Sequence, residues 1–230
     1  NSRMSARDLL ASSRQAGASP RSIMSTPPDV AAEREAVLHG PKATDAIRVM
    51  DLRVVYKSPD GVMPDKVAVN SLSMGIPIGE CFGLLGPNGS GKSSAINCLC
   101  GYQTPTSGTA FVAGLNILED IDLVHLSLGV CPQENVLWEE LTGEEHLRFY
   151  GRLKDLGGKA LDDEVALRLQ QVELHNDGHK AAGAYSGGMQ RRLCVAIALM
   201  GTPAVIALDE PSTGLDPAAR RTLWNVIRSC

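Results

Sequence analysis

The sequence predicts an α/β fold: a mostly parallel sheet with helices on both faces and an inserted helical subdomain at about 134–200. Three observations support this. A continuous apolar run at 204–208 is typical of a strand buried on both faces of a parallel sheet. A glycine-rich loop at 86–91 separates an apolar run from a helical pattern. From about residue 134 the apolar period changes from two to about 3.6 residues, which indicates helices.

The glycine-rich loop is part of Gly86–Ser93, which reads Gly-Pro-Asn-Gly-Ser-Gly-Lys-Ser, the G-x-x-x-x-G-K-S pattern. The N–H groups of such a loop and of the helix after it favour negative charge. The glycines let the backbone close on phosphate oxygens. We therefore predict a nucleoside triphosphate site in which Lys92 reaches the β- and γ-phosphates and Ser93 ligates Mg²⁺.

Two acidic residues, Asp209 and Glu210, directly follow the strand predicted at 204–208. They would lie at the C-terminal edge of the sheet, where α/β proteins bind ligands. There Asp209 completes a Mg²⁺ site and Glu210 deprotonates a water that attacks the γ-phosphate. The alternative is an ordinary acidic turn. Gln133, after the strand predicted at 128–131, is a further candidate ligand of the metal or the water.

A second glycine pair occurs in Ser186–Gln190, at the start of a helical pattern. A serine and two glycines at a helix start form a second anion-binding surface. One mononucleotide seldom needs two such surfaces in one chain, so we expect a second domain to share them across an interface. The alternative is a simple helix N-cap. Tyr56 either stacks on adenine or is a core or loop tyrosine.

The other elements follow from local patterns. A capping box at 142–145 opens a helix that runs to about Leu153. Apolar stripes predict further helices at about 161–172 and 189–200, and a last helix starts at Asp216-Pro217. The remaining predicted strands are 47–50, 52–56, 67–76, 80–85 and 109–113.

Residues 1–46 are rich in Ser, Ala, Arg and Pro without a sustained period, so we predict a disordered linker there, followed by the α/β domain at 47–230. An organelle transit peptide is the alternative, because the first 28 residues hold four arginines and one acid. Since the chain begins with Asn1 rather than Met, we expect a linker within a longer protein.

The composition argues against two classes of protein. A net charge of −4 gives no electrostatic reason to bind nucleic acid. No apolar run approaches the 18 residues of a membrane span. The six cysteines fall mostly in apolar runs without zinc spacing, which predicts reduced, buried thiols and a cytosolic compartment.

Together these residues resemble the nucleotide-binding domain of ATP-binding cassette transporters, over about Ile47 to Cys230. The resemblance implies a P-loop NTPase core with an antiparallel β-subdomain and the inserted helical subdomain. It implies ATP and Mg²⁺ as cofactors. Gly86–Ser93 is similar to the Walker A loop, Gln133 to the Q-loop and Ser186–Gln190 to the family signature. Asp209 and Glu210 are similar to Walker B and its catalytic glutamate.

The resemblance also implies the site residues. Glu210 and Gln133 are catalytic, and Ser93, Gln133 and Asp209 hold the metal. Asp216 is similar to the D-loop and Tyr56 to the adenine-stacking aromatic. The residues that contact nucleotide are then Tyr56, Gly86, Asn88, Gly89, Gly91, Lys92, Ser93, Ser94, Ser186, Gly187, Gly188, Gln190 and Asp216.

A finer similarity is to subfamily A, whose eukaryotic members move lipids and sterols. It is carried by 131–138, 141–147 and 185–192. The sequence departs from the family at Tyr185, where many members have Leu, and at Ser93-Ser94, where Thr-Thr is common. The family's switch histidine, normally a few tens of residues after Glu210, does not occur in this chain, so we expect a C-terminally incomplete domain.

The resemblance implies an ATP-hydrolysing domain on the cytosolic face of a membrane lipid transporter. Its partners are a second nucleotide-binding domain and the transmembrane domains, and lipid is reached through the latter. Two alternatives stay open: a soluble ATPase of the same superfamily acting on nucleic acid or ribosomes, and a non-hydrolysing regulatory domain. A GTPase or small-molecule kinase is disfavoured, because the Asn-Lys-x-Asp motif for guanine is absent and the Ser-Gly-Gly stretch would be unexplained.

Overall fold

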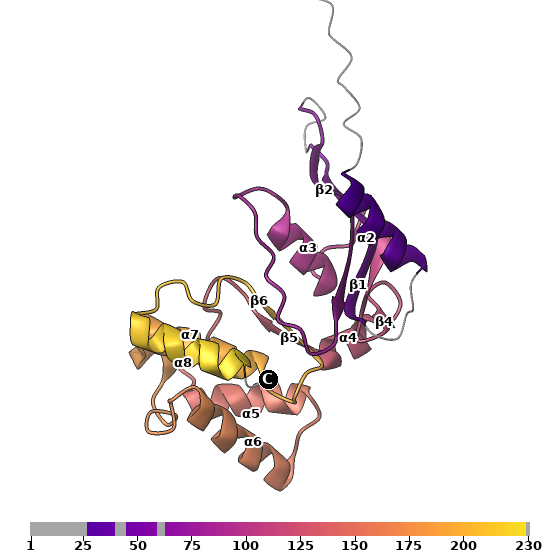
Figure 1. Cartoon of the computed structure of the whole chain (residues 1–230). Coiled ribbons are helices and arrows are strands. Elements are labelled where there is room, and N and C mark those ends of the chain that lie inside the picture. The colour runs from indigo at the N-terminus through magenta and orange to yellow at the C-terminus, as the bar shows by residue number, and fades with distance from the viewer. Residues whose placement is uncertain (1–26, 40–44, 59–62, 229–230) are drawn as a thin grey trace, which may run out of the picture.

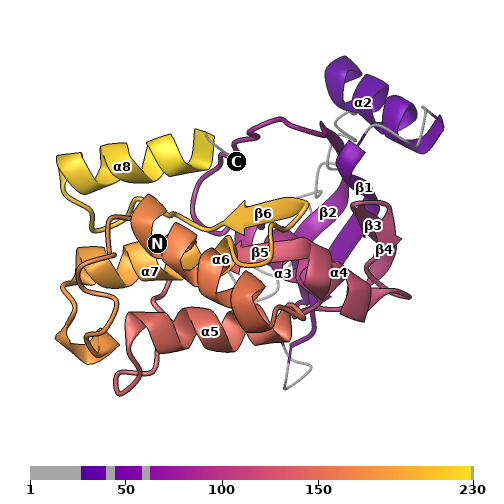
Figure 2. The same ribbon diagram turned by 90° about the horizontal axis from the view of Figure 1, so that it is seen from below.

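The computed structural model describes residues 27–39, 45–58 and 63–228. A four-stranded antiparallel sheet lies at one end and a group of helices at the other, with a two-stranded parallel sheet between them (Figure 1). Figure 2 shows the same arrangement from below. Strands and helices alternate along the chain, which confirms the predicted α/β class.

The antiparallel sheet has the strand order β2-β1-β3-β4. The strands predicted at 47–50 and 52–56 are a single strand, β1, because a bulge lets the chain keep pairing with β2 past Asp51. Asp51 has a φ of 49° at this bulge. The strands are β1 (Asp45–Tyr56), β2 (Lys66–Pro77), β3 (Ser107–Val112) and β4 (Leu115–Asn116).

Helix α2 (Pro28–His39) lies inside the stretch 1–46 that the sequence predicted to be a disordered linker, and here the prediction was wrong. The rest of that stretch up to residue 26, and 40–44, lie outside the described residues. Polar contacts hold α2 on the sheet. Arg34 donates to both carboxylate oxygens of Asp51 at 2.7 Å, and Glu33 Oε1 accepts from the Gly75 N–H at 2.8 Å. These contacts join α2 to β1 and β2, so no periodic apolar pattern within residues 28–39 predicts them.

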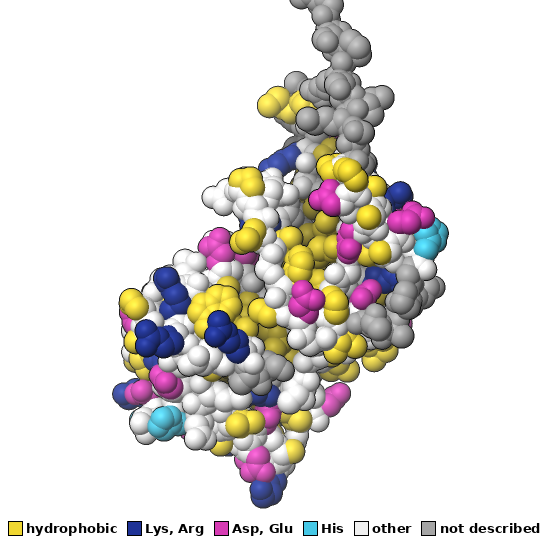
Figure 3. Space-filling view, viewed as in Figure 1, with side chains coloured by type: hydrophobic (Ala, Val, Ile, Leu, Met, Phe, Trp, Pro, Cys, Tyr) yellow, Lys and Arg dark blue, Asp and Glu magenta, His cyan; other side chains and the backbone are white. Residues whose placement is uncertain are grey.

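The strand predicted at 80–85 does not form. This segment runs as a loop from β2 to α3, and it shares no backbone ladder with another described strand. Its side chains Phe82 and Leu85 are 45% and 93% exposed. Hydrophobic side chains are visible on this face between α2 and α8 (Figure 3). An apolar run becomes a strand only where a neighbour pairs with its N–H and C=O groups, and none does so here among the described residues.

Helices α3 (Lys92–Leu99) and α4 (Ile121–Ser127) pack with the inner face of the antiparallel sheet around one hydrophobic core. Helix α4 was not predicted from the sequence, and it buries only Val124 completely among its own residues. Figures 1 and 2 show α2 and α3 on opposite sides of the sheet.

The parallel sheet consists of β5 (Leu128–Cys131) and β6 (Val205–Leu208). Cys131 pairs with Leu208 at the ends of the two strands. Because the strands are parallel, the residues that follow them emerge at the same edge of the sheet.

The remaining helices form two further cores, and α7 contributes to both. One of its residues, Leu193, packs toward α5 and α6, whereas Val195 packs toward α8. The predicted capping box at Thr142 and Glu145 is confirmed. The elements are α5 (Gly143–Leu153), α6 (Gly158–Gln171), the short 3₁₀ helix η1 (Ala182–Ala184), α7 (Gly187–Ala198) and α8 (Pro217–Arg228).

Two further findings concern the described part of the chain. No helix there has the length and hydropathy to cross a membrane. Its five cysteines are free, and all but Cys81 are buried. Burial raises the pKa of Cys131 to about 11 and that of Cys194 to about 12, so these thiols stay protonated at neutral pH.

Candidate nucleotide-binding site

The loop at 86–91 needs glycine for two reasons. Gly89 and Gly91 have φ of 80° and 97°, a region that residues with a Cβ rarely adopt. A Cβ on Gly91 would also lie 2.3 Å from the carbonyl oxygen of Ala68, so the loop passes too close to β2 for any larger residue. Asn88 lies exposed in the turn of this loop. The loop leads directly into α3, which begins at Lys92.

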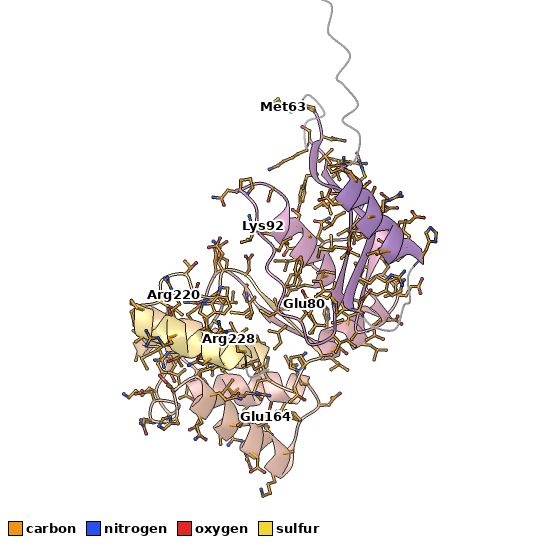
Figure 4. The ribbon with its side chains drawn as sticks, viewed as in Figure 1. Met63, Glu80, Lys92, Glu164, Arg220 and Arg228 are labelled. Atoms are coloured by element: carbon orange, nitrogen blue, oxygen red, sulfur yellow. The ribbon has the colours of Figure 1, made fainter. Side chains whose placement is uncertain are left out.

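Lys92 is held against the loop that precedes it. Its ammonium group donates to the carbonyl oxygens of Gly86 at 2.7 Å and Pro87 at 3.1 Å. Figure 4 shows Lys92 at the start of α3, beside this loop. The helix N-terminus adds unpaired N–H groups and the positive end of the helix dipole. Positive charge and donors therefore converge where a phosphate chain would bind.

Ser93 and Asp209 meet across the molecule, although 116 residues separate them in the sequence. The Ser93 hydroxyl lies 3.5 Å from Asp209 Oδ2. Neighbouring ligands of an octahedral Mg²⁺ at 2.0–2.1 Å lie about 3 Å apart, so this pair fits two adjacent positions of such an ion. A hydroxyl and a carboxylate are hard oxygen donors, the type that Mg²⁺ prefers. The metal roles of Ser93 and Asp209 stay predictions that this geometry favours.

Gln133 and Glu210 also come together, from the ends of β5 and β6. Gln133 Nε2 donates to Glu210 Oε2 at 3.4 Å. The same carboxylate oxygen accepts from the Thr213 hydroxyl at 3.1 Å, so the Glu210 side chain is oriented from two sides. Sequence reasoning missed Thr213. A hydroxyl three residues after an acid in a turn is a local signal that would have indicated it.

Tyr56 lies at the end of β1, next to α3. Its hydroxyl is 3.2 Å from the hydroxyl of Ser94, the residue after Ser93. The side chain is 39% exposed, so it is not a core tyrosine. The structure thus brings Tyr56 beside the glycine loop, while its stacking on adenine stays a prediction.

The predicted second anion-binding surface corresponds to the start of α7. The Ser186 hydroxyl caps this helix by accepting from the Met189 N–H at 3.3 Å, and Gly187 and Gly188 form its first turn. Gln190, expected to contact nucleotide, instead donates to the carbonyl oxygen of Ala182 at 3.1 Å. In Figures 1 and 2 α7 lies away from α3, so these residues are not gathered at the loop 86–91 of their own chain.

The Asp216 side chain accepts hydrogen bonds at the start of α8. Its Oδ1 accepts from the N–H groups of Ala218 and Ala219, each at 2.9 Å. These donors lower the pKa of Asp216, with the Ala219 N–H the largest cause. In this structure the side chain therefore serves as the N-cap of α8.

Comparison with known proteins places this geometry in a family. The family described as ABC transporter matches residues 69–213. ABC transporter A family member 5 of Arabidopsis thaliana is 55% identical over 205 residues, which cover 87% of this chain and 22% of that protein. Member 3 of the same plant family is 58% identical over 180 residues, covering 77% of this chain and 19% of that protein. The chain spans about a fifth of the length of these curated relatives.

Solved structures agree. An ATP-binding subunit of an ABC transporter superposes with a TM-score of 0.72 at 26% identity, covering 80% of this chain and 74% of that one. A dimeric ATP-binding cassette solved with ADP and phosphate has the same fold, with a TM-score of 0.71 at 23% identity over 79% of this chain and 81% of that one. Family, relatives and fold therefore agree: the chain belongs to the ABC transporter family, as an ATP-binding cassette similar to those of the A family members.

Proposed function

We propose that the cassette binds Mg-ATP at the loop 86–93 and powers lipid or sterol transport by pairing with a second cassette. The observation that carries the proposal is the meeting of Ser93 with Asp209, and of Gln133 with Glu210, at one edge of the sheet. Charge, hydroxyl and carboxylate groups gather there beside the glycine loop, as ATP hydrolysis requires.

In this proposal Lys92 and the loop N–H groups bind the β- and γ-phosphates, and Tyr56 stacks on the adenine. Mg²⁺, when bound, neutralises phosphate charge, and Ser93, Gln133 and Asp209 are the residues that would hold it.

The hydrolytic step is assigned to Glu210. Its carboxylate takes a proton from the attacking water, whose oxygen forms a bond to the γ-phosphorus while the bond to the β-phosphate oxygen breaks. Gln133 and Thr213 hold the carboxylate in place through the contacts at 3.4 and 3.1 Å. ADP and phosphate are the products.

The pairing with a second cassette would use the start of α7. Ser186 and the two glycines after it present a capped helix N-terminus that lies away from the loop 86–91 of the same chain. A partner cassette that offers its own ATP would bring a γ-phosphate to this surface. A cassette of the same fold has been solved as a dimer with ADP and phosphate, which supports this arrangement.

An exposed aromatic surface formed by Trp138 and Phe149 supports coupling to transmembrane domains. Trp138 and Phe149 are 45% and 43% exposed, and their rings meet edge to face at 5.2 Å. With Glu140 and Leu141 they line a shallow pocket of about 270 Å³. Exposed apolar surface of this kind is typical of protein interfaces. It suits the cytosolic end of a membrane domain.

The test uses the whole transporter chain that contains this cassette, reconstituted in vesicles with a fluorescent phospholipid or sterol. We expect ATP to drive movement of the lipid between leaflets, and Glu210→Gln to abolish it. The amide keeps the size and hydrogen bonding of the carboxylate but accepts no proton, so ATP binding should persist while hydrolysis falls by orders of magnitude.

Two results would contradict the proposal. Undiminished ATP hydrolysis in the Glu210→Gln variant would remove the assigned base. ATP hydrolysis stimulated by RNA or ribosomes but not by lipid would favour the soluble-ATPase alternative instead.

A further inference from the structure

Arg191, in the second turn of α7, is a buried cation with an unusual set of partners. The residue is 3% exposed. Its guanidinium makes no ion pair within the described part of the chain, and it donates to four backbone carbonyl oxygens. Burying a charge is costly unless its donors are satisfied, so such a group persists only where many acceptors converge.

The four acceptors come from the two loops that carry the proposed catalytic groups. After β5, the guanidinium binds the carbonyl oxygens of Pro132 and, at 3.2 Å, of Gln133. After β6, it binds those of Asp209 at 2.6 Å and Pro211 at 3.2 Å. One side chain therefore joins the two loops just where the parallel strands end.

Among the described residues, backbone hydrogen bonds between the two loops extend only one residue past the ends of β5 and β6. A bond from the Asp209 N–H to the Cys131 carbonyl oxygen, at 2.9 Å, extends the strand ladder by one residue. Beyond it, the contacts of Arg191 continue the connection between the loops. The planar guanidinium carries five N–H donors in a fixed arrangement, which suits several carbonyls at once.

Glu210 lies between two of these acceptors. It has a φ of 46°, in the left-handed region that is unfavourable for a residue with a Cβ. The carbonyl before it, of Asp209, and that of the next residue, Pro211, both accept from Arg191. The strained conformation that aims the Glu210 side chain at Gln133 is thus held by bonds on either side.

We propose that Arg191 is a positioning residue for ATP hydrolysis, which holds Glu210 and Gln133 in their mutual geometry through the backbone. This inference rests on the proposed role of Glu210. Arg191 does not touch the reacting atoms. Because Arg191 lies on α7, which Ser186 caps, it also links the position of that helix to the residues proposed for hydrolysis in the same chain.

The test measures steady-state ATP hydrolysis by the whole transporter chain carrying Arg191→Met or Arg191→Lys. Methionine fills the space but donates nothing, so kcat should fall about tenfold or more, because small misplacements of catalytic groups have effects of this size. The KM for ATP and the affinity for a fluorescent ATP analogue should stay within about twofold, since none of the bonds of Arg191 reaches the loop 86–93. Lysine restores one or two bonds and should rescue part of kcat.

Arg168→Met is the matched control. Arg168 is also buried, at 6% exposure, but its guanidinium binds Glu164 and Gln171 within the helical part. Its loss should lower thermal stability and leave kcat unchanged. If Arg191→Met does not fold, the kcat of Arg191→Lys is compared with that of the wild type instead.

A double-mutant cycle separates positioning from general support. In the Glu210→Gln background, Arg191→Met should reduce the residual hydrolysis little further, because the base that it positions is already lost. The inference would be overturned if the double variant lost activity by the product of the two single-variant factors in kcat. An unchanged kcat in both Arg191 variants would overturn it as well. An unchanged rate in Glu210→Gln alone would instead contradict the proposed function.

Discussion

At the scale of single residues, the site depends on side chains that already have partners in the protein. The Lys92 ammonium binds two loop carbonyls, and the Glu210 carboxylate accepts from Gln133 and Thr213. Such bonds fix the groups before a ligand arrives, which reduces the entropy lost on binding. The side chains of the proposed nucleotide site are thus largely preorganised by contacts within the protein.

Lys92→Ala is predicted to weaken ATP binding about tenfold or more, because a charge-assisted hydrogen bond contributes about 1.5–3 kcal/mol. Titration with a fluorescent ATP analogue measures this. Lys159→Ala, which removes an exposed lysine paired with Asp163 on α6, is the matched control and should bind as the wild type does. Equal affinity in all three proteins would exclude the phosphate role of Lys92.

At the scale of elements, helix termini and turns do much of the positioning. Gly91 opens α3, Ser186 caps α7 and Asp216 caps α8. These helix starts could be predicted from the sequence, because a cap acts on the N–H groups two or three residues away. Helix α2 could not be predicted in this way, since its Arg34 meets its partner Asp51 only when the sheet has formed.

The cap of α8 predicts a pH dependence. Since backbone N–H groups lower the pKa of Asp216 in the folded state, the carboxylate stabilises the fold fully above its ordinary pKa of about 3.8 and loses this effect as pH falls through the lowered value. We expect Asp216→Ala to be less stable than the wild type at pH 7, with the difference shrinking toward pH 3.

Urea unfolding at both pH values measures this difference. Asp216→Asn is the matched variant, because asparagine caps a helix without titrating and should stay closer to the wild type at pH 7. A difference between wild type and Asp216→Ala that is the same at pH 7 and pH 3 would show that the cap does not depend on ionisation.

At the scale of the whole molecule, the segment 80–85 is the part that the described structure leaves without a sheet partner. Leu85 is 93% exposed, and β5 and β6 form a sheet of only two described strands. Apolar segments with unpaired backbone groups favour association or further pairing. Order at this segment matters for function because it leads directly into the glycine loop.

We therefore predict that residues 1–230 in isolation bind Mg-ATP weakly and hydrolyse it far more slowly than the whole transporter chain. Phosphate release measured on both proteins tests the rates, and amide hydrogen exchange tests whether 80–85 is protected only in the longer chain. Equal turnover by the two proteins would show that the segment needs no further partner.

Local patterns in the sequence predicted most of the helices of this protein and named the residues of its proposed nucleotide site. The loop 86–93, the acids at 209–210 and the caps of α5, α7 and α8 are local patterns, and local patterns act through backbone geometry within a few residues. The helix α2, the absent strand at 80–85 and the four carbonyls around Arg191 were decided only by the tertiary structure. One physical reason explains all three. Each depends on whether backbone or charged groups that are distant in the sequence meet a partner, and such pairing produces no periodic pattern in the sequence.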